Sequence, residues 1–189
     1  MRILVVNCNT SEEMTAAIGA GAAAAARPGT EVVAVQPNWG PRSAEGFYES
    51  YITAAAVLDR LATYPEPFDA VVMAGFGEHG REGARQLLDV PVVDITEAAA
   101  HLACLLGHRY GVVTTVPVAI GQIRDSLQTA GLLERCASIR ATDLAVLDLA
   151  SDWDRTAAAF VATGREALTD GAEVLILGCS GMTGLQERV

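Results

Sequence analysis

The chain has 189 residues and a formal net charge of −10, and 51% of its residues are hydrophobic while 19% are charged. This composition predicts a folded chain with one domain or two small half-domains, and it argues against a disordered one. Because the acidic balance leaves no basic stripe for a phosphate backbone, we expect no nucleic-acid partner.

Apolar runs predict strands at 3–6, 31–35, 70–74, 91–93, 110–114, 136–139 and 174–177. Helical patterns between them predict helices at 10–27, 47–63, 96–106 and 154–168, one that ends at 88 and one that begins at 117. The segment 37–46 is rich in turn residues. The first helix is expected to begin at a Thr10-x-x-Glu13 capping box.

This alternation predicts an α/β fold with mainly parallel sheets flanked by helices. Two strand-to-turn junctions, Met73–Gly77 and Leu177–Gly181, are similar to each other and suggest an internal duplication. We therefore expect two similar lobes, 1–95 and 96–189, with the last helix of the chain free to return to the first. Since ligands bind beyond the carboxyl ends of parallel strands, the site is expected in the cleft between the lobes.

All 13 basic residues are arginine, and lysine is absent. A chain without lysine cannot hold pyridoxal phosphate as a Schiff base and cannot be an ordinary Walker-A nucleotidase. The first strand is followed by Asn-Cys-Asn-Thr rather than by a glycine-rich turn, so a dinucleotide site is also disfavoured. The cysteines and histidines complete no zinc pattern. We expect neither a cofactor nor a metal.

The sequence shows no signal-peptide pattern and no apolar stretch long enough to span a bilayer. The four cysteines, at 8, 104, 136 and 179, have no CxxC spacing. We expect a reduced, cytoplasmic protein with no membrane association.

Cys179 is the first candidate for chemistry, because it follows a strand and precedes a predicted helix between Gly178 and Gly181. A helix N-terminus would stabilise its thiolate and lower its pKa. The alternative is an inert buried thiol. Cys8 follows the first strand in the same manner, but packing is the stronger interpretation there, as it is for the remaining two cysteines.

Small polar side chains at strand ends and in loops are further candidates for binding a small carboxylate. The alternative for these residues is a structural role, namely helix capping, ordinary strand packing or solvation in a loop. These candidates are Asn9, Thr10, Ser11, Ser43, Thr114 and Thr115, together with Phe76, Glu78, His79, Ser180 and Gly181 at the two junctions.

Six motifs recur in order across nearly the whole chain: ILVVNCNTS at 3–11, PRSAEG at 41–46, AGFGEHG at 74–80, PVVDITEAA at 91–99, YGVVTT at 110–115 and LGCSGM at 177–182. Together they resemble the aspartate/glutamate/hydantoin racemase family, and its hydantoin and allantoin racemase branch most. The resemblance implies a cofactor-independent isomerase that acts on a small carboxylate or hydantoin-like substrate and forms a homo-oligomer. It also implies two cysteines, one per lobe, that face opposite sides of the stereocentre.

The chain departs from this pattern at the first-lobe cysteine, because Gly75 stands at that position while Cys179 matches the second-lobe cysteine. Cys8 replaces a common proline, and Glu78-His79 replaces the usual Asp-Pro. Members of the family normally continue through one more strand and helix after the position of Val189, so we expect the second lobe to lack these two elements.

Three functions therefore stay open. In an isomerase, Cys179 would act on one face, and His79, Glu78 or a water would act on the other. A one-cysteine decarboxylase would resemble arylmalonate decarboxylases, which have glycine at the first-lobe position. A non-catalytic binder of small anions would keep only the cleft.

We call the expectation that Gly75 and Cys179 face each other across the cleft the facing-lobe hypothesis. If it holds, Gly75→Cys should create or raise racemase activity.

Overall fold

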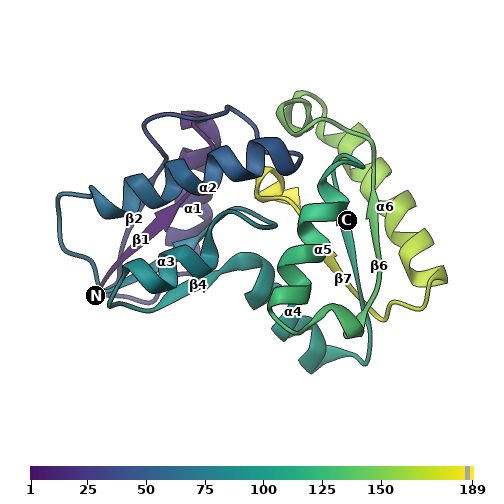
Figure 1. The fold of residues 1–189 in the computed structure, drawn as a ribbon. Coiled ribbons are helices and arrows are strands. Elements are labelled where there is room, and N and C mark those ends of the chain that lie inside the picture. The colour runs from purple at the N-terminus through teal and green to yellow at the C-terminus, as the bar shows by residue number, and fades with distance from the viewer. Residues whose placement is uncertain (186–187) are drawn as a thin grey trace.

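Two parallel sheets lie side by side in the computed structural model, which describes residues 1–185 and 188–189 (Figure 1). The first sheet has the order β2-β1-β3-β4. Its strands are β1 (Arg2–Val6), β2 (Glu31–Val35), β3 (Ala70–Met73) and β4 (Val92–Asp94). The second sheet has the order β6-β5-β7 and consists of β5 (Tyr110–Thr114), β6 (Cys136–Ala141) and β7 (Val174–Leu177). The predicted two-lobe α/β fold is thus confirmed.

Helices connect successive parallel strands, as the alternating sequence pattern predicts. The helices are α1 (Glu12–Ala25), α2 (Phe47–Ala62), α3 (Arg81–Leu87), α4 (Ile95–Leu106), α5 (Ala119–Thr129) and α6 (Trp153–Thr169). Three 3₁₀ segments, Leu133–Arg135, Val146–Ser151 and Ser180–Met182, were not predicted. The α-helix that comes last in the described chain, α6, packs on β5 and β6 of the second lobe.

The first helix begins one residue later than its capping box predicts. Ser11 is the N-cap residue, and its hydroxyl accepts a hydrogen bond from the Met14 N–H at 3.3 Å. The Thr10 hydroxyl instead donates to the carbonyl of Pro41 at 3.3 Å. A sequence with adjacent Thr and Ser offers two equivalent caps, and the contact with Pro41 decides between them.

Aliphatic strand residues form the core of each lobe. Leu4 and Val71 are fully buried in the first lobe, and Val112 is fully buried in the second. Strands buried on both faces have continuous apolar runs rather than alternating ones, which is why the sequence marks them so clearly.

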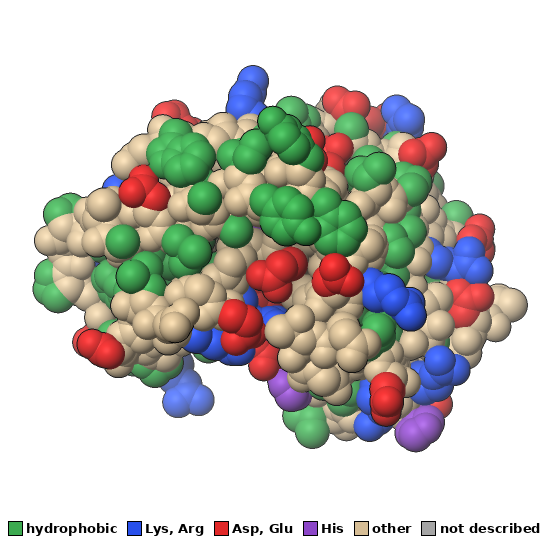
Figure 2. All heavy atoms as spheres, in the orientation of Figure 1, with side chains coloured by type: hydrophobic (Ala, Val, Ile, Leu, Met, Phe, Trp, Pro, Cys, Tyr) green, Lys and Arg blue, Asp and Glu red, His purple; other side chains and the backbone are tan. Residues whose placement is uncertain are grey.

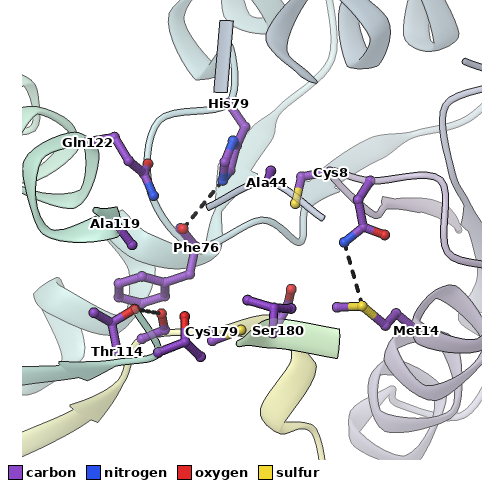
Figure 3. A pocket seen from close by; sticks show the side chains of 14 residues that line it. Cys8, Met14, Ala44, Phe76, His79, Thr114, Ala119, Gln122, Cys179 and Ser180 are labelled. Atoms are coloured by element: carbon purple, nitrogen blue, oxygen red, sulfur yellow. Dashed lines mark hydrogen bonds between the residues drawn. The ribbon is translucent and has the colours of Figure 1, made fainter. Parts of the chain in front are cut away.

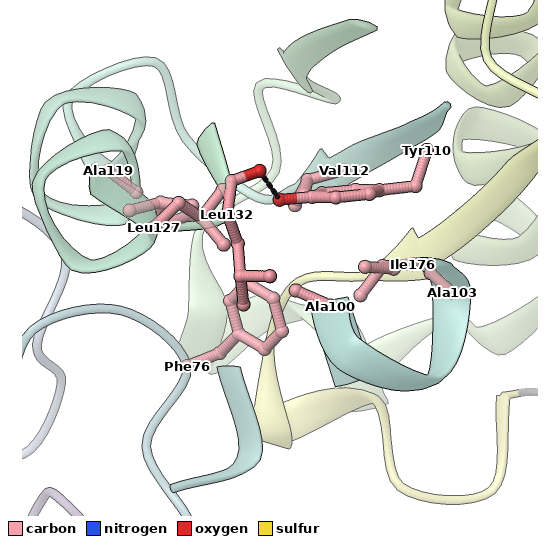
Figure 4. Packing of buried hydrophobic residues seen from close by; sticks show 10 residues of the cluster. Phe76, Ala100, Ala103, Tyr110, Val112, Ala119, Leu127, Leu132 and Ile176 are labelled. Atoms are coloured by element: carbon pink, nitrogen blue, oxygen red, sulfur yellow. Dashed lines mark hydrogen bonds between the residues drawn. The ribbon is translucent and has the colours of Figure 1, made fainter. Parts of the chain in front are cut away.

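Phe76 links the two lobes, because its side chain belongs to the hydrophobic core of the second lobe (Figure 4). It follows β3 of the first lobe, yet its ring packs with Ala100, Ile176 and their neighbours in the cluster of the second lobe. The junction after β3 is therefore anchored in the opposite lobe.

Arg81 makes a second link between the lobes. Its side chain, at the start of α3, is only 1% exposed and lies 3.7 Å from the equally buried carboxylate of Asp94. The same guanidinium donates to the Ser126 hydroxyl and to the Ser126 carbonyl on α5, both at 3.4 Å. A buried cation held in this way fixes α3 against α5.

Apolar side chains gather on the outer surface over α2 (Figure 2), where Tyr48 and Tyr51 are 75% and 70% exposed. Within the described residues, no helix is long and apolar enough to cross a membrane.

We expect Arg81→Met to lower the free energy of unfolding by about 3–5 kcal/mol, because the substitution leaves Asp94 buried without its counter-charge. Urea denaturation followed by circular dichroism measures this change. Arg85→Met is the matched control on the same helix. Arg85 is partly exposed and bonds Glu97 at 2.6 Å, so its loss should cost less than about 1 kcal/mol. Equal losses in the two variants would contradict a structural role for Arg81.

Candidate active site

A small cavity lies between the lobes, at the carboxyl ends of the strands (Figure 3). It is lined by Cys8, Asn9, Met14, Ala44, Phe76, His79, Thr114, Thr115, Ala119, Gln122, Val146, Gly178, Cys179 and Ser180. Both lobes contribute to its wall, as the facing-lobe hypothesis predicts.

Strand pairing decides which residues meet at this cavity. In the first lobe Val6 of β1 pairs with Met73 of β3, so the chain positions two residues further on, Cys8 and Gly75, lie abreast. In the second lobe Val113 pairs with Leu177, which sets Thr115 beside Cys179. Gly75 is therefore the first-lobe counterpart of Cys179.

The space beside Gly75 is already occupied. A Cβ atom at position 75 would lie 2.5 Å from the Cys8 Cβ, 2.9 Å from the Cys8 Sγ and 2.5 Å from the His79 Cδ2. Because real Cβ atoms do not approach other atoms so closely, Gly75 is the residue that leaves room for Cys8. The expectation that Gly75→Cys alone raises activity does not fit this packing.

Cys179 lies on the cavity wall, but its environment differs from the predicted one. The segment after it is a single 3₁₀ turn, Ser180–Met182, rather than an α-helix. Burial raises the pKa of the Cys179 thiol to about 11, although the Gly181 backbone N–H opposes this shift. The prediction of a lowered pKa is therefore wrong, since one short turn does not offset desolvation.

Cys8 is 7% exposed and is a second thiol on the cavity wall. Burial raises its pKa to about 12, and a negative charge on Cys179 raises it further. Cys179 is thus close enough to influence the ionisation of Cys8. With pKa values of about 12 and 11, Cys8 and Cys179 are both mainly protonated at neutral pH.

His79 is buried rather than solvated, with 3% of its surface exposed. Burial lowers its pKa to about 4, so the imidazole is neutral. Its Nε2 lies 3.4 Å from the Phe76 carbonyl, while its Nδ1 has no hydrogen-bond partner among the described residues.

The segment 41–46 covers the cavity from the first lobe. Its Pro41 carbonyl accepts the Thr10 N–H at 3.1 Å. Its Glu45 carboxylate accepts both the Ser43 hydroxyl and the Val146 N–H of the second lobe, each at 3.0 Å. Thr10 and Ser43 therefore hold the covering segment instead of lining the cavity.

The remaining candidates fall into two groups. Asn9, Phe76, His79, Thr114, Thr115, Cys179 and Ser180 line the cavity together, as expected. Ser11 and Gly181 instead line a neighbouring hollow of about 550 Å³, which Ser180 also lines. Glu78 lines neither of these two spaces, and its N–H donates to the Gln122 side chain at 2.6 Å.

The cavity has a volume of about 20 Å³. That volume holds about one water molecule, so an organic ligand enters only after some part of the wall moves. Met14 and Val146, together with Ser180, line both the cavity and the outer hollow. These three residues separate the two spaces.

Several wall residues were not predicted from the sequence. Met14, Ala44, Ala119 and Val146 are ordinary apolar residues with no local pattern to mark them, and Gln122 lies within a helix. For Cys8 the sequence favours a packing role. The signal that could have marked it as a site residue is the pairing of the first and third strands, which puts the ends of both at one sheet edge.

The described cavity wall carries no Lys, Arg, Asp or Glu side chain. Across residues 1–185 and 188–189, no group of three or more His, Cys, Asp or Glu residues is arranged to hold a metal ion. The site therefore offers neutral hydrogen-bonding groups and two thiols.

Comparison with known proteins identifies the family. The model of the Asp/Glu/hydantoin racemase family matches residues 3–189. A hydantoin racemase from Pseudomonas sp. (strain NS671) is 37% identical over 184 residues, which cover 96% of this chain and 74% of that protein. The crystal structure of allantoin racemase from Pseudomonas fluorescens matches with a TM-score of 0.97 at 53% identity, over 100% of this chain and 80% of that one.

The chain belongs to the Asp/Glu/hydantoin racemase family. This confirms the resemblance seen in the six motifs, and it makes the protein an isomerase of the racemase type. A variant of arylmalonate decarboxylase matches with a TM-score of 0.55 at 12% identity, over 100% of this chain and 93% of that one. That likeness shows a common two-lobe fold.

We expect Glu45→Ala to free the covering segment, because it removes the acceptor that holds Val146. Amide hydrogen exchange at Val146 should accelerate about tenfold, in line with the loss of one hydrogen bond to a charged group. The Leu144 amide, which donates to the Thr115 carbonyl at 3.3 Å, is the internal control and should keep its rate. Unchanged exchange at Val146 would show that Glu45 does not hold the segment closed.

Proposed function

We propose that the protein racemises a hydantoin-like ring at the carbon next to a carbonyl group, with Cys179 as an acid–base residue. The observation that carries this proposal is the position of Cys179 on the wall of a small, uncharged cavity between the lobes. A carbon acid needs a base at van der Waals distance and a site from which water is excluded. The names of the hydantoin and allantoin racemases that the chain resembles fit this reaction.

The uncharged wall favours a neutral ring over a dicarboxylate. A buried carboxylate without a cationic partner is strongly destabilised, and the described wall supplies no arginine. A hydantoin ring instead presents amide groups, which the side chains of Asn9, Gln122 and Thr115 can bind through hydrogen bonds.

The same wall can stabilise the charge that develops when the proton leaves. Removal of the ring proton places negative charge on the neighbouring carbonyl oxygen, so donors fixed around that oxygen lower the barrier. Gln122 accepts the Glu78 N–H through its side-chain oxygen. Its amide nitrogen is directed towards the cavity (Figure 3).

The other two functions fit the cavity less well. A decarboxylase acting on malonates and a binder of small anions would both bring carboxylate charge into a space without a cationic side chain on its described wall. The likeness to arylmalonate decarboxylase concerns the fold alone.

We also propose a cytoplasmic location, because all four cysteines are free and a reducing compartment keeps thiols in that state.

We expect Cys179→Ser to lower racemisation about 100-fold or more, because a serine hydroxyl is a far weaker base than a thiolate. The assay incubates each enantiomer of allantoin and of a 5-substituted hydantoin in D2O and follows optical rotation and loss of the ring C–H signal by NMR.

Cys104→Ser is the matched control. Cys104 packs from α4 against the core of the second lobe, away from the cavity, so this variant should keep the rate. Release of CO2 from substituted malonates without racemisation of any hydantoin would contradict the proposed function.

The rate should also depend on pH in a way that identifies the base. Since the pKa of Cys179 is raised to about 11, its thiolate fraction grows with pH throughout the neutral range. We expect kcat/KM to rise about tenfold per unit between pH 6.5 and 8.5. Initial rates in that range measure this, and a flat profile would instead indicate a base already deprotonated, such as neutral His79 with a pKa of about 4.

A further inference from the structure

We infer that Cys8 is the second acid–base residue of this site and acts on the face of the substrate opposite to Cys179. The inference rests on the proposed racemisation and names the group that the sequence left open between His79, Glu78 and a water. The family resemblance expects the first-lobe sulfur after β3, whereas the inference assigns this role to the sulfur after the neighbouring strand β1.

The strand register supports this position. Gly75 is the topological counterpart of Cys179, since each residue lies two positions beyond the last paired residue of its strand. Gly75 has no side chain with which to move a proton. Cys8 lies directly beside it, two residues beyond the end of β1. A sulfur that follows β1 therefore stands next to the position where the chain after β3 would carry one.

The packing supports it independently. The Sγ of Cys8 lies 2.9 Å from the point where a Cβ of residue 75 would lie, and its Cβ lies 2.5 Å from that point. A side chain at 75 and the cysteine at 8 therefore exclude each other. The glycine at 75 leaves this space to the Cys8 side chain and to the Cδ2 edge of His79.

Both sulfurs belong to the same cavity. Cys8 reaches the cavity from the first lobe and Cys179 from the second, on different sides of the enclosed space (Figure 3). A charge on Cys179 raises the pKa of Cys8, so when one sulfur is ionised as a thiolate the other stays a thiol. A two-face proton transfer requires that combination.

The proton balance closes with these two groups alone. A thiolate on one side takes the ring proton, so that an S–H bond forms as the C–H bond breaks and its electrons move onto the carbonyl oxygen. The thiol on the other side then donates its proton to the carbon, and a new C–H bond forms on the opposite face. The two sulfurs have exchanged protonation states, and the site is ready to act on the other enantiomer.

His79 is the strongest competitor, because its ring also touches the space beside Gly75. Its Nε2 already faces the Phe76 carbonyl at 3.4 Å. The edge that reaches position 75 carries Cδ2, which cannot accept a proton. We therefore assign His79 to packing against Cys8, where it holds the thiol in place.

Deuterium exchange of the separate enantiomers tests the role of Cys8. In D2O the Cys8→Ser variant should lose racemisation about 100-fold or more. It should still exchange the ring hydrogen of one enantiomer with retained optical rotation, because Cys179 serves one face. Cys179→Ser should exchange only the other enantiomer. A thiol with a merely structural role would not produce this opposite selectivity.

The outcomes separate the two proposals. A wild-type protein that racemises no hydantoin or allantoin overturns the proposed function, and the role of Cys8 with it. Racemisation that persists in folded Cys8→Ser overturns the role of Cys8 alone. One-enantiomer exchange in His79→Ala, with both enantiomers exchanged by Cys8→Ser, assigns the second face to His79 and also overturns the inference.

The second test moves the first-lobe cysteine from position 8 to position 75. Cys8→Gly combined with Gly75→Cys removes the clash between these positions, and His79→Ala clears the remaining one. In the His79→Ala background we expect Cys8→Gly to abolish racemisation and the added Gly75→Cys to restore it at least tenfold. Circular dichroism and thermal unfolding confirm that each variant is folded. A folded combination with no recovery would contradict a sulfur-dependent first-lobe face.

Discussion

Parallel pairing of β1 with β3, and of β5 with β7, is the constraint on which the site depends. Each pair ends at the same sheet edge, so residues two positions beyond the last pair stand side by side. Because the two edges face each other, Cys8, Thr115 and Cys179 line one small cavity, and Gly75 lies beside Cys8. Phe76 and Arg81 then fix the distance between the lobes by entering the opposite one. The geometry of the two thiols thus follows from the backbone pairing and from two buried cross-lobe contacts.

Most of the fold could be predicted from the sequence, and the reason is physical. Short apolar runs bounded by turn residues are typical of strands, so β2, β5 and β7 have the bounds that the pattern predicts. The N-cap at Ser11 instead of Thr10, and the 3₁₀ segment at Val146–Ser151, depend on contacts with distant residues. Local patterns do not contain that information.

The site was predictable where chemistry coincides with a strand end, and not elsewhere. Cys179 and Thr115 follow strands directly, and they do line the cavity. The ionisation of Cys179 was misjudged, because the effect of a helix N-terminus can be read from sequence while desolvation cannot. Met14 and Val146 reach the wall only through tertiary packing. The sequence does not mark Cys8 as a site residue, because its proposed role depends on Gly75, which follows a different strand. No single segment of the sequence shows that these two residues are neighbours.

The short distance between positions 8 and 75 also restricts how the wall of the first lobe can be redesigned. In this backbone a Cβ at 75 would lie 2.5 Å from the Cys8 Cβ. A larger residue at 75 therefore requires a backbone shift or a change at position 8 as well, and protein engineering has to treat the two positions as one unit.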